Sequence, residues 1–501
     1  MQPNCHAEER LALLQFKDSF MINKSASINP YPKVSSWTLN DCCSWDGVEC
    51  DEHTGHVIGL DLSRSCLYGS FDSNSSLFRL LQLQKLNLAY NHFNYSQIPF
   101  RVAHFLRLAY LDLSHSVFSG RIPQSLANLS FLTDLRLDNC ALYEEFPTTI
   151  FYLPNLQHLS IGDNQDITGS IPPSVSNLTQ LNFLDLPDNT FTGHIPSSLS
   201  NLTQLTYLGL SNNHLEGALP IPAPSTKRYG IEHNSLKGEI SPLICNVSSL
   251  EELLLFDNNL SGTLPRCLGN FSSSLSVFDL GGNNFYGPIP KTWAKGSSLR
   301  MIDLSQNQLQ GQLPKSLANC TMLEYLHVGT NQINDTFPFW LGTLPQLKLL
   351  VLRSNEFYGV IRNPETNHAF PMLRIIDISH NDFSGNLPSG YFQHWTAMKT
   401  FESTTQLTYM QASFSGEGWD SQFSYSFTIT NRGKELNYYT IQDTLSAVDL
   451  SSNRFEGKIP EEIGNLKALH LLNLSNNDLT GQIPPPLGTG KHDRARISGP
   501  L

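Results

Sequence analysis

The sequence predicts an α/β repeat solenoid, in which short coils stack so that their parallel strands line one concave face. Three observations predict this fold class. One phrase recurs about every 24 residues, each copy contains a Leu alternation that fits a short strand, and an Asn follows at a fixed distance. The phrase is Leu-x-x-Leu-x-Leu-x-x-Asn-x-Leu-x-Gly-x-Ile-Pro, with clean copies at 181–196, 299–314 and 469–484. The 501 residues can therefore form one array that grows by stacking.

Each part of the phrase has a physical role. The alternating Leu side chains face the core, and the residues between them face solvent. The Asn amide can donate to and accept from backbone groups that the turn leaves unpaired, and Pro ends a second short strand because it cannot continue a ladder. About sixteen leucine-rich-repeat coils are predicted from this position, occupied in turn by Ser65, Asn91, Ser116, Cys140, Asn164, Asn189, Asn213, Asn234, Asn258, Asn283, Asn307, Asn331, Asn355, Asn381, Asn453 and Asn477.

The first 55 residues are predicted to form a cap on the stack. An uncapped end would expose unpaired strand groups and Leu side chains. Leu13, Phe16 and Phe20 have the spacing of one helix face that can cover the first coil. The organisation expected for the rest is about 14 coils over 56–389, an island insertion over 390–443, two coils over 444–488, and an irregular tail over 489–501.

The cysteines indicate a stapled cap and no metal site. Spacing favours Cys43 with Cys50 and Cys5 with Cys42, although three pairings are possible for four cysteines. Cys245 and Cys267 lie one coil apart, which predicts a lateral disulfide, whereas Cys66, Cys140 and Cys320 fit buried core slots. A zinc site from Cys43, Cys50, His53 and His56 has poor ligand spacing, so we expect neither a metal nor another cofactor.

Composition and sequons indicate an extracellular protein. The net charge of −12 and the lack of a basic cluster argue against a nucleic-acid partner. The chain as given has no leader and no apolar run that could span a bilayer. The Asn-x-Ser/Thr sequons, which are candidate glycosylation sites, are Asn23, Asn74, Asn94, Asn128, Asn177, Asn201, Asn246, Asn259, Asn270, Asn319, Asn334 and Asn473.

A candidate ligand-binding row lies on the concave face. Tyr110, His158, Phe183 and Tyr207 take the same strand position in different coils, and Arg136 lies nearby. Exposed aromatic and Arg side chains dominate protein contacts, although a merely solvated surface explains the row equally well. The sequence contains no nucleophile elbow, zinc-protease helix or phosphate loop, so we predict a binding protein and not an enzyme.

The island is rich in aromatic residues and is predicted to carry a hairpin over 425–438, since its residues alternate and Asn431-Arg432-Gly433 is a turn signal. The aromatic content favours an ordered, functional insertion. We take Trp395, Trp419, Tyr425 and Phe427 as candidate contact residues. The alternative is that about half of the island aromatics only pack the insertion onto the coils.

The chain resembles the plant leucine-rich-repeat receptor-like proteins of the Cf disease-resistance type. The resemblance covers 5–488 and is carried by Gly-x-Ile-Pro, by the cap segment Cys-Cys-Ser-Trp-Asp-Gly-Val-Glu-Cys at 42–50, by the island, and by the phrases at 391–398 and 447–453. The chain departs from the family pattern in lacking a leader, an acidic segment and a membrane helix, and in having few coils after the island.

The resemblance implies a cell-surface receptor without a kinase domain, anchored by one membrane helix. Such a receptor would bind a peptide or protein ligand from a pathogen and signal in plant immunity through a receptor-kinase co-receptor or adaptor, with the island helping to recruit it. We interpret this chain as an ectodomain fragment that would be secreted if it had a signal peptide. Two alternatives are a soluble inhibitor of a microbial wall-degrading enzyme and a non-functional, truncated relic of a receptor.

Overall fold

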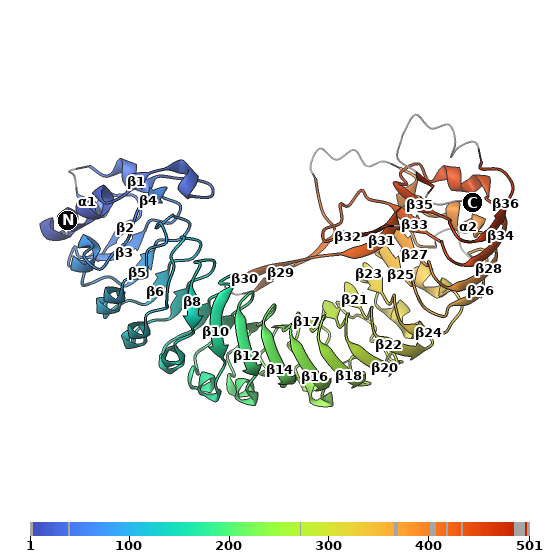
Figure 1. Cartoon of the computed structure of the whole chain (residues 1–501), viewed down its shortest axis with the longest axis horizontal. Coiled ribbons are helices and arrows are strands. Elements are labelled where there is room, and N and C mark those ends of the chain that lie inside the picture. Colours follow the sequence, from blue (N-terminus) through green and yellow to red (C-terminus); the bar gives the residue numbers. More distant parts are fainter. Residues whose placement is uncertain are drawn as a thin grey trace. The chain divides into compact units, whose positions relative to one another are not determined.

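The computed structural model describes residues 4–38, 41–270, 272–364, 369–400, 407–416, 419–431, 434–484 and 496–497. The chain consists of two compact units, Met1–Lys237 and Gly238–Leu501. In both units one short strand per coil contributes to a parallel sheet (Figure 1), which is the sheet that the Leu alternation predicts. The predicted solenoid fold class is confirmed.

The principal sheet of the first unit begins with an antiparallel pair, β2 (Val48–Cys50) and β3 (Val57–Asp61). Parallel strands follow one coil at a time. They are β5 (Lys85–Asn87), β6 (Tyr110–Asp112), β7 (Asp134–Arg136), β9 (His158–Ser160), β11 (Phe183–Asp185), β13 (Tyr207–Gly209) and β15 (Arg228–Gly230). Because the register is kept from strand to strand, side chains at equivalent positions form straight columns across this face.

A second parallel sheet and a row of 3-10 helices complete the coils of the first unit. The sheet contains β8 (Tyr143–Glu145), β10 (Asp166–Ser170), β12 (Thr190–His194), β14 (His214–Ala218) and β16 (Ser235–Glu239). The helices are η4 (Ser76–Arg79), η5 (Phe100–His104), η6 (Gln124–Asn128), η7 (Thr148–Tyr152), η8 (Pro173–Asn177) and η9 (Ser197–Asn201). Between β14 and β15, where Pro222 and Pro224 lie, the described residues contain no such helix.

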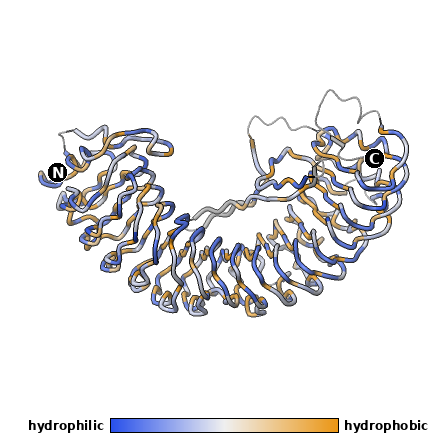
Figure 2. Tube along the Cα trace, in the orientation of Figure 1, coloured by the Kyte–Doolittle hydropathy of each residue, from blue (hydrophilic) through white to orange (hydrophobic). Residues whose placement is uncertain are grey.

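The asparagine of the phrase is a buried hydrogen-bonding centre. Asn164 donates through Nδ2 to the carbonyl oxygens of Leu137, Ile161 and Gly162, and its Oδ1 accepts from two backbone amides of the preceding coil. Ser116 and Cys140 replace Asn with a single donor, each bonding a carbonyl oxygen of the preceding coil. Apolar and polar residues alternate along the coils (Figure 2), and nearly all phrase Leu side chains are buried.

The N-terminal cap has the helix that the apolar spacing predicts. Helix α1 (Ala7–Asp18) buries Leu13 and Phe16. Its buried Glu9 accepts from the backbone N–H of Val57 at 2.9 Å and contacts Nδ1 of His56 at 3.0 Å, which ties the helix to the first strand. Disulfides join Cys5 to Cys42 and Cys43 to Cys50. The remaining cap elements are β1 (Met21–Ile22), β4 (Leu67–Tyr68), η1 (Lys24–Ala26), η2 (Lys33–Ser36) and η3 (Cys42–Ser44).

The second unit repeats this plan. Its principal sheet contains β17 (Glu252–Leu254), β19 (Val277–Asp279), β21 (Met301–Asp303), β23 (Tyr325–His327), β25 (Leu349–Val351), β27 (Ile375–Asp377), β33 (Ala447–Asp449), β35 (Leu471–Asn473) and β37 (Arg496–Ile497). Strands β27 and β33 pair directly although the island separates them in sequence. The insertion therefore leaves the repeat register intact.

Outer strands and 3-10 helices again complete the coils. The strands form two sheets: β18 (Asn259–Thr263), β20 (Asn284–Pro288), β22 (Gln308–Gly311) and β24 (Gln332–Ile333), and then β26 (Tyr358–Val360), β28 (Asp382–Asn386), β34 (Arg454–Lys458) and β36 (Asp478–Thr480). The helices are η10 (Pro242–Asn246), η11 (Lys315–Asn319), η12 (Phe339–Thr343) and η14 (Glu461–Asn465). A disulfide joins Cys245 to Cys267, and Cys66, Cys140 and Cys320 are buried free thiols.

The island consists of two short helices followed by two antiparallel hairpins. They are α2 (Ser389–Phe392) and η13 (Thr396–Met398), then β29 (Gln411–Gly416) with β30 (Trp419–Ser424), and β31 (Phe427–Asn431) with β32 (Lys434–Tyr438). The second hairpin has the position that the aromatic alternation predicts. It lies across the principal sheet near β23, β25 and β27 (Figure 1), and this placement decides which concave surface is covered.

Candidate functional site

Three rings of the predicted aromatic row, those of His158, Phe183 and Tyr207, form a stacked ladder on the concave face of the first unit. Tyr110 is in register with Asp134, which is followed by His158, Phe183 and Tyr207. The ring centroids of His158 and Phe183 are 4.1 Å apart, and those of Phe183 and Tyr207 are 4.2 Å apart, in both cases with nearly parallel planes. The ladder is therefore a rigid, aligned surface feature.

The central rings of the ladder are less exposed than the sequence predicts. His158 and Phe183 are each only 9 % exposed, because each ring is covered by its stacked neighbour. Burial, followed by the charge of Arg136, lowers the pKa of His158 to about 3, so the imidazole is neutral at ordinary pH. A ligand can reach mainly the edges of these two rings and the half-buried Tyr110 and Tyr207.

Arg136 lies beside the first ring of the row, as expected. Its guanidinium carbon is 5.7 Å from the centroid of the Tyr110 ring, and Lys85 Nζ is 5.6 Å from the same centroid. The Tyr110 hydroxyl donates to Asp112 at 3.2 Å. Burial and Asp112 raise the pKa of Tyr110, so the hydroxyl remains a donor. Tyr110 thus combines a hydrogen-bonding hydroxyl with a ring that lies near two cationic side chains.

Buried carboxylates next to the ladder are functional candidates that the sequence did not reveal. Asp185 occupies a position that matches ordinary repeat residues, yet burial and the neighbouring Asp138 raise its pKa to about 8. Burial also raises the pKa of Asp138, which accepts hydrogen bonds from Ser160 and Gly162. The sequence signal was the pair of glycines at the facing positions, Gly162 and Gly209, because a Cβ atom at either one would lie against one of these carboxylates.

Stability should depend on the ionisation of the Asp185 carboxyl at pH values up to about 8. The folded pKa of about 8 lies above the ordinary 3.8, so the folded state holds a proton that the unfolded state releases, and stability is lost as pH rises through 8. We expect Asp185→Asn to flatten the fall in melting temperature between about pH 6.5 and 8.5 and to raise it by a few degrees at the upper end.

Differential scanning calorimetry of the secreted chain at both pH values measures this effect. Asp163→Asn is the matched control, because it removes an exposed carboxyl from the same unit. A wild-type pH slope in Asp185→Asn would show that another group carries the dependence.

The island residues proposed as contacts do not form an accessible surface. Trp395, Tyr425 and Phe427 are 1 %, 0 % and 4 % exposed, which corrects the prediction that they contact a ligand. Trp395 packs against Tyr391 and Phe392, whereas the other two enter the core over the concave sheet. The side chain of Trp419 lies outside the described residues.

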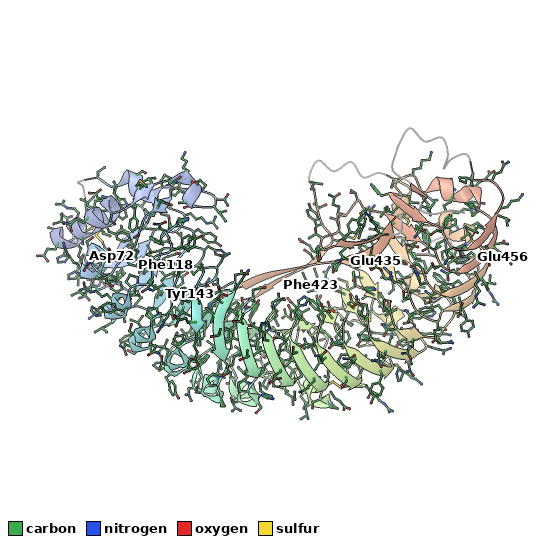
Figure 3. The ribbon with its side chains drawn as sticks, viewed as in Figure 1. Asp72, Phe118, Tyr143, Phe423, Glu435 and Glu456 are labelled. Carbon is green, nitrogen blue, oxygen red and sulfur yellow. A yellow bond between two sulfur atoms is a disulfide. The ribbon has the colours of Figure 1, made fainter. Side chains whose placement is uncertain are left out.

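The concave column of the second unit is apolar, which explains this burial. Residues at the nominally solvent-facing position pack against the hairpins, namely Val277, Met301, Tyr325, Leu349, Ile375 and Ala447. The Tyr325 hydroxyl donates to the Ser426 carbonyl oxygen at 2.8 Å. Arg353 donates to the carbonyl oxygen of Thr428 and pairs with Glu435 at 2.9 Å; Glu435 projects from β32 in Figure 3. The apolar column is therefore the docking surface of the island.

Sequon positions leave the ladder unobstructed. Asn128, Asn177 and Asn201 are exposed at the ends of η6, η8 and η9, away from the principal sheet. Asn473 corrects the prediction of glycosylation, because it is 5 % exposed on β35. Its Nδ2, the atom that would carry a glycan, donates to Asp449 and Ser451.

Two other features of the described residues resemble binding sites. The sulfurs of Cys5, Cys42 and Cys43 lie together, but all three are disulfide-bonded and so cannot serve as thiolate ligands. A lateral hollow of about 650 Å³ in the first unit is lined by residues that include Asp72, Phe100 and Tyr143; Asp72 and Tyr143 are labelled in Figure 3. An Arg121–Glu144 ion pair lies within its lining. The concave ladder, with its aligned rings and the half-buried Tyr110 and Tyr207, is the stronger candidate.

Comparisons with known proteins agree with the repeat and the cap. Residues 70–415 match the family described as a leucine-rich repeat region, residues 6–51 match the leucine-rich-repeat N-terminal domain, and 444–466 and 468–489 match single leucine-rich repeats. Among solved structures, the plant peptide hormone receptor RGFR1 in complex with RGF2 aligns with a TM-score of 0.70 and 27 % identity, over 91 % of this chain and 68 % of that one. The Arabidopsis receptor kinase HAESA, in complex with the peptide hormone IDA and the co-receptor SERK1, has a TM-score of 0.63 and 25 % identity, over 96 % and 88 %.

Curated relatives are plant receptor-like proteins. Receptor-like protein 6 of Arabidopsis thaliana is 42 % identical over 206 residues, which are 37 % of this chain and 21 % of that protein. Receptor-like protein 34 of the same plant is 32 % identical over 79 % of this chain and 38 % of its own length. Receptor-like protein Cf-9 of Solanum pimpinellifolium is 33 % identical over 34 % of this chain and 27 % of its own length.

These relatives are much longer than the chain, which spans between about a fifth and two fifths of their length. No helix among the described residues is both long and apolar enough to cross a membrane. The repeat phrase, the stapled cap and the relatives lead to one conclusion. The chain belongs to the leucine-rich-repeat family, among the plant receptor-like proteins.

Proposed function

We propose that this chain is the extracellular recognition part of a cell-surface receptor that binds a peptide or protein ligand on the concave face of its first unit. The ligand comes from a pathogen, and the bound receptor signals in plant immunity through a partner receptor kinase. The observation that carries the proposal is the aromatic ladder of His158, Phe183 and Tyr207, with Tyr110 in the same column. The ladder is a rigid surface on a repeat scaffold whose sequons lie elsewhere.

The contrast between the two units supports the choice of surface. The concave sheet of the second unit packs against the island and so cannot accept a ligand along the same column. In the first unit the equivalent column carries half-buried Tyr110 and Tyr207 next to charged side chains. The solved relatives RGFR1 and HAESA were captured with peptide hormones, HAESA also with a co-receptor, which supports a peptide ligand and a kinase partner.

Binding to the secreted, full chain tests the proposal. Fractions of pathogen culture filtrate are passed over the immobilised chain, and the affinity of each retained component is measured by biolayer interferometry. We expect Tyr110→Ala and Tyr207→Ala each to weaken binding about tenfold or more, because truncation of a central aromatic contact costs about 2 kcal/mol. Tyr152→Ala, which removes an exposed ring at the end of η7, is the matched control.

A retained component that binds all three variants equally would contradict the concave site. Ligand-dependent association with a receptor-kinase ectodomain, measured by size-exclusion chromatography, tests the signalling partner. Inhibition of a microbial wall-degrading enzyme by the chain alone would favour a soluble inhibitor instead.

A further inference from the structure

Four consecutive coils of the first unit expose an apolar side chain at the turn that ends the 3-10 helix. These side chains are Leu81, Leu106, Phe131 and Tyr152, which are 61 %, 62 %, 61 % and 65 % exposed, and we call them the outer apolar row. Large apolar side chains exposed on neighbouring coils form a patch that is unfavourable in water. Such a patch is expected to have a cover.

The next two coils carry polar residues at the same turn. The exposed residues there are Thr179 and Gln180 in one coil and Thr203 and Gln204 in the next. The backbone N–H of Thr179 donates to the carbonyl oxygen of the last helical residue, as that of Leu106 does in its own coil, so the turns share one geometry. The outer apolar row therefore arises from the side chains of its coils and not from a different backbone.

A sequon lies within the row. Asn128 is the last residue of η6, and Phe131 follows three residues later. Tyr152 ends η7 and so takes the position of Asn128 in the following coil. Because neighbouring strands lie about 4.8 Å apart, equivalent residues of adjacent coils are close neighbours. The side chain of Asn128 is exposed and has no hydrogen bond among the described residues, so its Nδ2 is free to carry a glycan.

The position of this sequon favours a glycan over a protein partner as the cover of the row. A pyranose ring has a face of C–H groups that can pack on an aromatic ring while its hydroxyl groups remain in water. A glycan on Asn128 starts within the row, whereas a protein partner would have to dock around that glycan. Asn201, at the end of η9, has Thr203 and Gln204 beside it and offers no comparable apolar surface.

We propose that Asn128 is glycosylated and that its glycan packs over Leu106, Phe131 and Tyr152, which shields this part of the outer apolar row from water and from self-association. The shield lies at the ends of the 3-10 helices, whereas the proposed ligand contacts lie on the principal sheet. The proposal is therefore independent of the function proposed above.

Hydroxyl-radical footprinting of the secreted full chain tests this contact residue by residue. Glycopeptide mass spectrometry first shows whether Asn128 carries a glycan in the wild-type chain. We expect the oxidation of Phe131 and Tyr152 to rise several-fold in Asn128→Gln, because the rings lose their cover. Tyr286 of the second unit, which is 48 % exposed, should be oxidised equally in both proteins. The matched control Asn201→Gln should leave the oxidation of Phe131 and Tyr152 unchanged.

Two further variants separate shielding from a general effect of the glycan on folding. Ser130→Ala removes the sequon but keeps Asn128, and it should give the footprint of Asn128→Gln. By size-exclusion chromatography, we expect Asn128→Gln to form larger species than the wild-type chain at equal concentration. Adding Phe131→Ser and Tyr152→Ser to Asn128→Gln should restore the wild-type elution, or the wild-type yield if the single variant is poorly secreted.

Three results would overturn the proposal. The first is a wild-type chain with no glycan at Asn128. The second is equal oxidation of Phe131 in the wild-type chain and in Asn128→Gln. The third is association of the wild-type chain that Phe131→Ser abolishes, which would make the row an interface between copies of the chain.

Discussion

Replacing Asn164 by Ala is expected to lower the free energy of unfolding by about 3–5 kcal/mol and to prevent secretion of the folded chain. Asn164 is fully buried, and its amide makes five hydrogen bonds to backbone groups of its own coil and the preceding one. Ala satisfies none of them, and water cannot reach the site to replace them. Several buried N–H and C=O groups are then left unpaired at once.

The amount of protein secreted from plant cells and its chemical unfolding midpoint measure the effect. Asn182→Ala is the control, because Asn182 is exposed just before β11 and its substitution should change stability by less than about 0.5 kcal/mol. Equal secretion of the two variants would contradict the role given to the buried amide.

Replacing Tyr425 by Ala is expected to release the island from the concave sheet of the second unit while the coils stay folded. Tyr425 is fully buried, and its ring centroid lies 5.3 Å from that of Tyr325. Truncation of a buried aromatic ring costs about 3–5 kcal/mol, which is large compared with the few polar contacts that also hold the hairpin, those of Tyr325 and Arg353.

Limited proteolysis with mass-spectrometric mapping tests this release. Cleavage should appear within 400–443 in Tyr425→Ala, and the thermal unfolding of the coils should shift by only a few degrees. Tyr439→Ala, which removes a ring that is 79 % exposed, should give the wild-type pattern. An island that stays resistant in Tyr425→Ala would mean that other contacts hold it.

The regular parts of the fold could be predicted from sequence because each coil repeats the same pattern of buried and exposed residues. The Leu alternation and the following Asn decide which side chains are buried, and those positions recur at a nearly constant spacing. The alignment of Tyr110, His158, Phe183 and Tyr207 followed from the same periodicity. Residues with a fixed place in the phrase are therefore predictable one coil at a time.

The features that the sequence did not predict depend on contacts between segments far apart in sequence. Met301 and Ile375 occupy solvent-facing positions of the phrase, and only the fold of the island explains why they are apolar. Asp185 matches an ordinary framework residue, and its perturbed pKa arises from burial and a carboxylate two coils away. Trp395 and Tyr425 were visible as aromatic residues, but sequence does not distinguish a ring that packs inward from one that meets a ligand.

The hydrogen bonds of the buried asparagines also give the stack an order of assembly. Asn213 donates to the Leu186 carbonyl oxygen and accepts from the Phe191 N–H, both in the coil before its own, and Asn307 does the same for Leu280 and Phe285. The backbone hydrogen bonds of each such coil are therefore complete only when the following coil has formed. On the ribosome, where the N-terminal coils emerge first, a nascent coil must wait for about 24 further residues before its turn is satisfied. Substitution of one of these asparagines therefore first leaves backbone groups unpaired in the coil that was synthesised before it.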